Sequence, residues 1–191
     1  MKILNPLYDT AFKVLMEDLD IAKGMIEAIT GLEIVELTFS ATERSRQNTR
    51  SPAKPITLYR LDFKAKVRDA NGQYRNILIE IQKAKLSDDI TRFRNYLGKQ
   101  YQTVDEIPND DGEVTRASLP IVVIHILGYP LDEHYPLAIH AKRVYQNPVQ
   151  PDSETPLQPH PFIEALSHDA YFIQITKAHQ VGQSASQLEK V

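Results

Sequence analysis

Two segments in the middle of the chain alternate hydrophobic and polar residues, which is typical of strands that bury one face. The segments are 57–68 and 74–83. Residues two apart lie on the same face of a strand. The apolar positions are Leu61, Phe63, Ala65 and Val67 in the first segment and Ile77, Ile79 and Ile81 in the second. With Asn71-Gly72 between the segments, the pattern predicts a β-hairpin with one apolar face.

The hydrophobic pattern also decides between two registers of this hairpin. A two-residue turn at Asn71-Gly72 would place Asp62 opposite Ile81, among the isoleucines. A three-residue loop at 70–72, with its glycine in the left-handed conformation, places Asp62 opposite Glu80 and gathers every apolar residue on one face. Since a slip of one residue turns every side chain to the other face, we predict the three-residue loop.

The flanking segments predict helices and a further strand. A helix capped at Asp9-Thr10 runs to about residue 29 and ends at Thr30-Gly31, and a strand follows at 32–39. The predicted core face of this helix comprises Phe12, Leu15, Met16, Leu19, Met25, Ile26 and Ile29. A second helix begins at Ser87-Asp88-Asp89, because serine caps helices and acids favour the positive end of the helix dipole. Its predicted inward residues are Ile90, Phe93, Leu97 and Tyr101.

The remainder of the chain predicts one more buried strand and a less regular C-terminal part. Residues 105–113 predict an acidic loop, whereas the continuously apolar run at 120–127 predicts a buried strand. The prolines of 147–161 predict an extended linker, followed by a short helix near 161–167 and a strand near 171–176. The order of helix, three antiparallel strands, helix and strand predicts an α/β fold, with a mixed sheet flanked by helices.

Composition narrows the class of protein. The chain has 191 residues, of which 42% are hydrophobic and 25% charged, as expected for one globular domain. It has no cysteine, which excludes disulfides, zinc–thiolate sites and a cysteine nucleophile, and suits a reducing cytosol. No segment has the pattern of a signal peptide or a membrane span. We therefore expect a cytoplasmic protein without membrane contacts.

Charge is divided unevenly along the chain. Residues 1–104 hold 17 Lys/Arg and 13 Asp/Glu, a balance of +4, and the remainder holds 5 and 12, a balance of −7. The basic residues of the first part surround Asp62 and Glu80 in the sequence. If Asp62 and Glu80 bind a metal ion, the cations around them would favour a phosphate substrate. For any single lysine or arginine here, an ordinary solvated surface position explains the charge equally well.

The two carboxylates of the hairpin are the strongest candidate for chemistry. Like charges directly opposite each other on a sheet are unfavourable, and a divalent cation between them would relieve the repulsion. Gln82 lies on the same side of its strand as Glu80. The alternative is that both acids are exposed and paired with Lys64, Arg60 or Lys66, the usual state of surface carboxylates.

Other motifs carry less weight. Ser167-His168-Asp169 favours a local turn over a catalytic triad, because the members of a triad come from separate segments. His125 lies within an apolar strand and is predicted to be a hydrogen-bonded core histidine rather than a metal ligand.

The ordered segments resemble the PD-(D/E)XK nuclease superfamily, and most closely its branch of recombination-promoting nucleases and transposase-like proteins. The resemblance spans about residues 5–130. Its motifs are NPLYDTAFKVL at 5–15, RLDF at 60–63, ILIEIQ at 77–82, RFRNYLGKQY at 92–101 and LPIVVIHILGY at 119–129. It implies a restriction-endonuclease-like α-β-β-β-α-β core.

The resemblance also implies the roles of several residues. Asp62 and Glu80 would bind Mg²⁺ (or Mn²⁺ or Ca²⁺) together with the backbone carbonyl of Ile81. Gln82 occupies the position of a lysine in many nucleases of the superfamily, although glutamine is common in this branch. Asp9 matches an acidic position of the branch and would either complete the metal shell or cap the first helix.

The implied activity is hydrolysis of DNA phosphodiester bonds by a metal-dependent endonuclease associated with recombination or mobile elements. The candidate DNA-binding residues are Arg44, Arg46, Lys64, Arg92 and Tyr96. Arg92 and Tyr96, one helical turn apart, would either face the site or form an ordinary surface pair. The alternative function is a catalytically weak or inactive module that keeps the fold and binds DNA or protein.

The resemblance also bears on domain organisation. We expect a nuclease-like domain at 1–146, with a proline-rich linker and C-terminal extension at 147–191 packed on it. Members of the branch are often longer, so a truncated form is one expectation for this chain. Cutting both DNA strands with one site per chain would call for a homodimer.

Overall fold

The structure is a computed structural model that describes residues 9–39, 58–68, 72, 74–84, 90–108, 111–150, 157 and 159–180. Four strands and three helices make up its first part: α1 (Asp9–Glu17), α2 (Leu19–Thr30), β1 (Glu33–Phe39), β2 (Leu58–Arg68), β3 (Tyr74–Ala84), α4 (Ile90–Tyr101) and β4 (Asp105–Pro108). The second part comprises β5 (Val114–Ala117), β6 (Ile121–Leu127), β7 (Ala138–Ala141), α5 (Pro161–Leu166), β8 (His168–Gln174) and a 3₁₀ helix (Ile175–Gln180).

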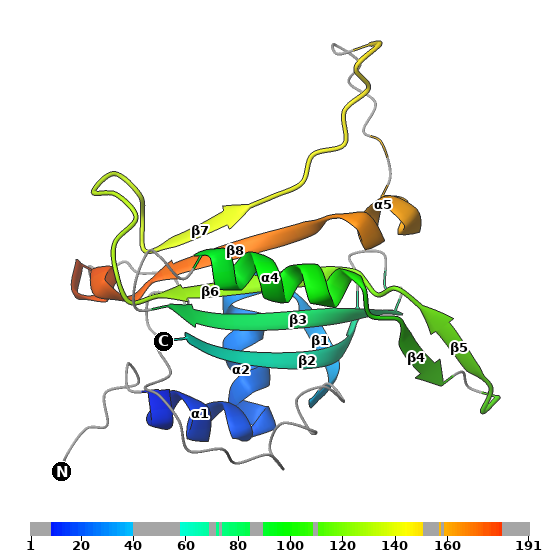
Figure 1. Ribbon diagram of the computed structural model, residues 1–191, viewed down its shortest axis with the longest axis horizontal. Helices are drawn as coiled ribbons and strands as arrows, with labels where there is room; N and C mark the ends of the chain where they lie inside the picture. Colours follow the sequence, from blue (N-terminus) through cyan, green and yellow to red (C-terminus); the bar gives the residue numbers. More distant parts are fainter. Residues whose placement is uncertain are drawn as a thin grey trace.

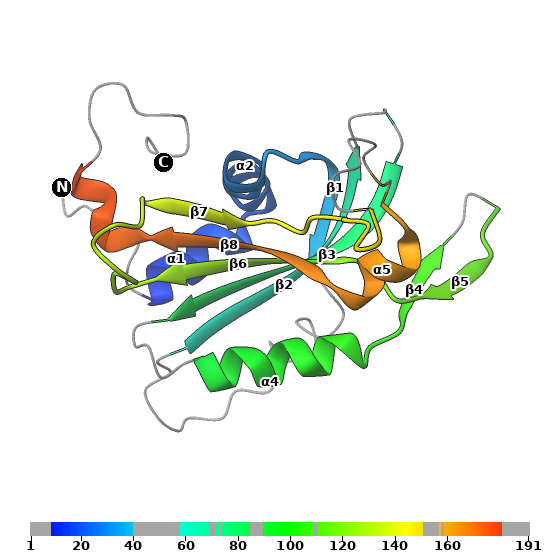
Figure 2. The same ribbon diagram turned by 90° about the horizontal axis from the view of Figure 1, so that it is seen from above.

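A mixed six-stranded sheet organises the molecule, with strand order β1-β2-β3-β6-β8-β7 (Figure 1). Strands β1, β2 and β3 are antiparallel, β3, β6 and β8 are parallel, and β7 pairs antiparallel with β8. The sheet lies between α2 on one face and α4 on the other (Figure 2). This arrangement confirms the predicted α/β class with a mixed sheet flanked by helices. The three predicted antiparallel strands are β1 to β3, and the predicted buried strand is β6.

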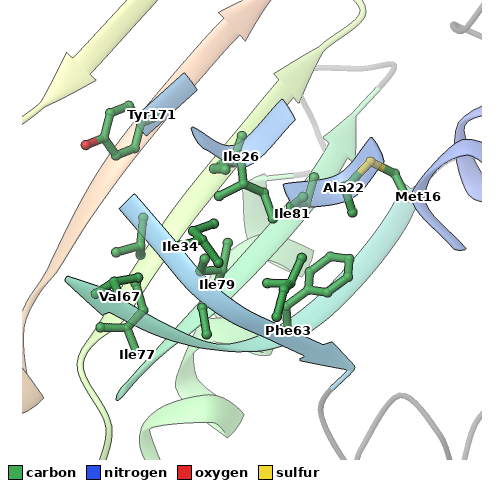
Figure 3. Packing of buried hydrophobic residues seen from close by; sticks show 14 of the residues in the cluster. Met16, Ala22, Ile26, Ile34, Phe63, Val67, Ile77, Ile79, Ile81 and Tyr171 are labelled. Atoms are coloured by element: carbon green, nitrogen blue, oxygen red, sulfur yellow. The ribbon is translucent and has the colours of Figure 1, made fainter. Parts of the chain in front are cut away.

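The main hydrophobic core lies between the sheet and the N-terminal helices (Figure 3). Phe63, Ile79 and Ile81 on β2 and β3 are fully buried, and Met16 and Ile26 of α1 and α2 pack in the same cluster. The predicted apolar face of the hairpin is therefore the core face. Its polar face, with Asp62 and Gln82, is turned toward the α4 side.

The register of the hairpin confirms the prediction. Asp62 pairs with Glu80, and Arg68 pairs with Tyr74 at the end of the ladder. Gly72 has φ +78°, the left-handed conformation predicted for it. The other residues of the loop at 70–72 lie outside the described residues.

The single N-terminal helix was a wrong prediction, because α1 and α2 are separated at Asp18. Asp18 is extended and caps α2, and its Oδ1 accepts hydrogen bonds from the backbone N–H groups of Asp20 (3.0 Å) and Ile21 (3.3 Å). The break rotates α2 relative to α1, so Ala22 is buried while Leu15 is 40% exposed. An aspartate followed by a second acid is a capping signal that the longer apolar periodicity obscured. The predicted end at Thr30-Gly31 is confirmed, since Gly31 caps α2 with φ +69°.

The acidic segment at 105–113 was also predicted wrongly. It contributes β4 to a two-stranded sheet with β5, which projects from the main sheet (Figure 1). Gly112 has φ +83° at its turn, and Asp111-Gly112 is a hairpin signal that the acidic composition masked.

Smaller differences concern the element ends in the C-terminal part. Strand β8 begins at His168 rather than near 171, and β7 precedes the segment predicted as a linker. The short helix near 161–167 is confirmed as α5. The predicted cap at Ser87-Asp88-Asp89 lies outside the described residues. None of the described helices is long and apolar enough to span a membrane.

Candidate active site

The register of three strands places the candidate residues in two neighbouring rows on the α4 face of the sheet. Asp62, Glu80 and Val123 form one row across β2, β3 and β6. Gln82 and His125 stand side by side in the next row. Val123 packs with Leu97 of α4, which identifies this face as the one that α4 covers.

Burial separates these residues from ordinary surface polar groups. The Asp62 side chain is 2% exposed and Gln82 is fully buried. Exposed carboxylates are the normal case, and burial of a carboxylate carries a cost that a bound cation or hydrogen bonds must offset. The alternative in which Asp62 is an exposed acid is therefore wrong. The side chain of Glu80 lies outside the described residues.

The lysines that flank Asp62 have other neighbours. Lys64 Nζ lies 2.7 Å from Asp105 Oδ1, and Asp105 is 5% exposed. Lys66 Nζ lies 5.4 Å from the ring centre of Tyr74. Lys64, predicted to bind DNA, thus has an intramolecular carboxylate partner that joins the β4–β5 hairpin to the sheet.

Helix α4 confirms two of its predicted inward residues, Phe93 and Leu97, but not the other two. Ile90 and Tyr101 were predicted to point inward but are 56% and 36% exposed. The inward stripe comprises Phe93, Tyr96, Leu97 and Gln100. Tyr96 packs in the cluster of Phe93 and Leu127, so its ring lies in the layer between α4 and the sheet.

Several predicted site residues fall where the structure gives no side chain. Arg44 and Arg46 lie outside the described residues. For Asp9 and Arg92 the helical backbone is described, but the side chain is not. For Asp9, the alternatives of metal ligand and helix cap stay predictions. For Arg92, the alternatives of facing the site and forming a surface pair stay predictions.

His125 differs from its prediction as a hydrogen-bonded core histidine. Its ring stacks on Phe172 with centroids 4.8 Å apart and lies 5.0 Å from the ring of Phe93. Its Nδ1 is buried and has no hydrogen-bond partner in the described part of the chain. Burial, with a smaller contribution from the charge of His168, lowers the pKa of His125 to about 4. The ring beside Gln82 is therefore neutral at neutral pH.

A second polar cluster, which no sequence motif indicates, holds α5, β8 and the segment after β7 together. Arg143 lies 3.0 Å from Glu164 Oε1 and 3.1 Å from Asp169 Oδ1. Glu164 also accepts a hydrogen bond from Tyr145 (2.6 Å) and pairs with Arg75 of β3 (3.1 Å). The motif Ser167-His168-Asp169 is thus neither a triad nor a turn, because Ser167 and Asp169 bind Arg143 while His168 Nδ1 bonds to Tyr101.

The donor chemistry of the Asp62 row fits a hard cation. Among the described residues, no three His, Asp or Glu side chains form a group that would hold a metal ion. Magnesium, however, prefers oxygen ligands and keeps several of its waters, so two carboxylates and a carbonyl suffice. Asp62 and Glu80 are directly paired, Ile81 follows Glu80 on β3, and the two carboxylates and the Ile81 carbonyl supply only oxygen donors.

Comparisons with known proteins do not place the chain in a family. No family model, curated protein or solved structure matches it. The structure itself defines the class of the fold, which is an α/β protein with a mixed sheet flanked by helices.

Proposed function

We propose that this protein is a metal-dependent endonuclease that hydrolyses phosphodiester bonds of DNA. The observation that carries the proposal is the pairing of Asp62 with Glu80, with Asp62 buried on the face that α4 covers. The sequence resemblance to PD-(D/E)XK nucleases assigns metal-binding roles to the same two residues. The association with recombination or mobile elements rests on the resemblance alone.

In this mechanism the residues of the two rows have separate tasks. Asp62, Glu80 and the carbonyl of Ile81 would hold Mg²⁺, with Mn²⁺ or Ca²⁺ as alternative ions. When bound, the metal would polarise the phosphate and activate a water molecule. Gln82, fully buried beside this row, would orient that water through its amide but would not supply positive charge as lysine does.

The surroundings of these rows restrict what else can take part. His125 stands next to Gln82 and is neutral at neutral pH, so it adds no positive charge there. Lys64, on the same face as Asp62, shares its charge with Asp105. Stabilisation of the charge that forms on the phosphate would then fall mainly to the metal and to cations such as Arg92.

A second function is favoured by one specific observation. Gln82 is fully buried and carries no charge, whereas the lysine common at this position stabilises charge directly. A module that binds DNA or another protein without cutting would keep the fold and tolerate this replacement. Metal-dependent cleavage separates the two functions.

The test of the proposed function is nicking of supercoiled plasmid DNA with Mg²⁺ or with EDTA. Wild-type protein is expected to nick only with Mg²⁺, and Asp62→Asn and Glu80→Ala are expected to lower the rate at least about a hundredfold. Glu133→Gln serves as the matched control, because Glu133 is an acid whose side chain is 85% exposed in the loop between β6 and β7.

Two outcomes would contradict the proposal. Nicking that persists in EDTA, or that Glu80→Ala leaves at the wild-type rate, would mean that the two carboxylates do not form the active site. DNA binding without nicking, equally strong in wild type and Glu80→Ala, would favour the non-catalytic module.

A further inference from the structure

A pocket of about 480 Å³ lies at one end of the α4 face, away from the N-terminal helices. Figures 1 and 2 show the C-terminal end of α4, helix α5 and the start of β4 gathered at this end of the molecule. Leu78, Leu119 and Ile121 line its buried part, each less than 10% exposed. Phe162 and Leu166 of α5 line it as well and are 68% and 64% exposed. The pocket thus joins a buried apolar part to an exposed aromatic ring.

Gln100 is the mostly buried polar side chain of this pocket. Gln100 is 6% exposed, and its side-chain amide makes no hydrogen bond in the part of the chain that the structure describes. Two other polar groups of the lining are engaged: the Tyr101 hydroxyl bonds to His168 Nδ1 at 2.7 Å, and Thr103 Oγ1 donates to the carbonyl of Lys99 at 3.2 Å. The Gln100 amide borders the open space of the pocket, so its donor and its acceptor are available to a ligand there.

The lining selects the chemistry of that ligand. No charged residue is among the described residues that line the pocket, which favours an uncharged group over a phosphate or an ammonium. The amide of Gln100 offers a donor and an acceptor in one plane, and the rings of Tyr101 and Phe162 offer faces for stacking. A planar aromatic ring with adjacent donors and acceptors on its edge matches both features. Nucleobases have this combination, and glutamine and aromatic side chains are common partners for them.

The position of the pocket connects it to the candidate active site. Leu78 lies two residues before Glu80 on β3 and on the same face of the sheet, about 7 Å along the strand. We propose that the pocket receives a nucleobase, unstacked from its neighbours, of a strand whose phosphate lies at Asp62 and Glu80. This inference rests on the proposed function and deepens it, because it names a substrate with an unpaired or extruded base.

The test compares binding of single-stranded oligonucleotides of about twelve nucleotides that differ by one missing base. Fluorescence anisotropy in EDTA gives the Kd of the intact oligonucleotide and of versions with one abasic residue at each position in turn. For wild type, removal of one particular base is expected to weaken binding at least about fivefold, since a base stacked on an aromatic ring contributes that much or more. In Gln100→Leu and Phe162→Ala the same removal is expected to change Kd by less than about twofold.

Controls make the outcomes distinct. Ile163→Ala changes a neighbouring residue of α5 that is 45% exposed and is not among the lining residues, so it should keep the wild-type dependence on the base. Phe162 is largely exposed, so Phe162→Ala remains informative even if Gln100→Leu fails to fold. Nicking with Mg²⁺ together with an equal effect of base removal in wild type and both variants would overturn this inference alone. Absence of both oligonucleotide binding and nicking would overturn the proposed function, and this inference with it.

Discussion

Replacement of Arg143 by alanine is expected to lower the free energy of unfolding by about 3 kcal/mol. The side chain of Arg143 is 19% exposed and lies between the carboxylates of Glu164 and Asp169, which are 9% and 23% exposed. Removal of the guanidinium leaves both carboxylates partly desolvated without their main cation. Glu164 still has its ion pair with Arg75, so the loss of stability is smaller than for a buried charge with no partner.

The geometry of Arg143 makes lysine a poor replacement. Its Nε and backbone N–H both donate to Asp169 Oδ1, and its Nη2 donates to Asp169 Oδ2. Its Nη1 reaches Ser167 and Glu164. Burial alone would raise the pKa of Asp169, but the hydrogen bonds and charge of Arg143 outweigh burial and lower that pKa. Arg143→Lys, without the planar fork, is expected to recover less than half of the loss.

Urea unfolding measures both effects. Arg116→Ala is the matched control, because the side chain of Arg116 is 72% exposed and its nitrogen lies 4.0 Å from Glu106. This change should alter the free energy of unfolding by less than about 0.5 kcal/mol. A loss from Arg143→Ala as small as that of the control would mean that the cluster does not hold α5 and β8 together.

Acidification is expected to destabilise the protein by about 3 kcal/mol between pH 7 and pH 4 through His125 alone. Burial lowers the pKa of His125 from its ordinary value of 6.5 to about 4, so the unfolded chain binds a proton in this range that the folded protein excludes. Stability therefore falls as the pH drops below 6.5, and the fall levels off below about pH 4. The neutral ring is favoured because it packs between Phe93 and Phe172.

Comparison with His125→Phe isolates this effect from other titrations. Phenylalanine keeps an aromatic ring between Phe93 and Phe172 but cannot take up a proton. Asp169, whose pKa is lowered, also loses its stabilising charge in acid, but it does so in both proteins. The difference in free energy of unfolding between the variant and wild type should grow by about 3 kcal/mol from pH 7 to pH 4. A difference that stays constant with pH would show that folding does not lower the pKa of His125.

The fold was largely predictable where local pattern and tertiary packing agree. The alternation in 57–68 and 74–83 fixed the register, because only one register puts every apolar residue on the core face. The helix break at Asp18 was missed because Phe12, Met16 and Leu19 continue one periodicity across it. On α4, Phe93 and Leu97 were predicted correctly, whereas the inward positions of Tyr96 and Gln100 were missed. An amphipathic pattern alone does not identify polar side chains that face a sheet.

The candidate site was predictable in its placement but not in its environment. The sequence placed Asp62 opposite Glu80, yet burial of Asp62 and Gln82 depends on which elements cover the sheet. The partner of Lys64 is Asp105, which comes from a hairpin predicted as a loop. Arg75 and Glu164 are 89 residues apart in the chain, a separation over which no local pattern indicates a contact.

The central claim is that Asp62 and Glu80 share one divalent cation, and titration with Mn²⁺ observed by electron paramagnetic resonance tests it most directly. Wild-type protein is expected to bind one Mn²⁺ per chain at this site, and either Asp62→Ala or Glu80→Ala should weaken that binding at least about tenfold. Glu133→Gln should bind as wild type does. Equal Mn²⁺ affinity in wild type and both alanine variants would contradict the account.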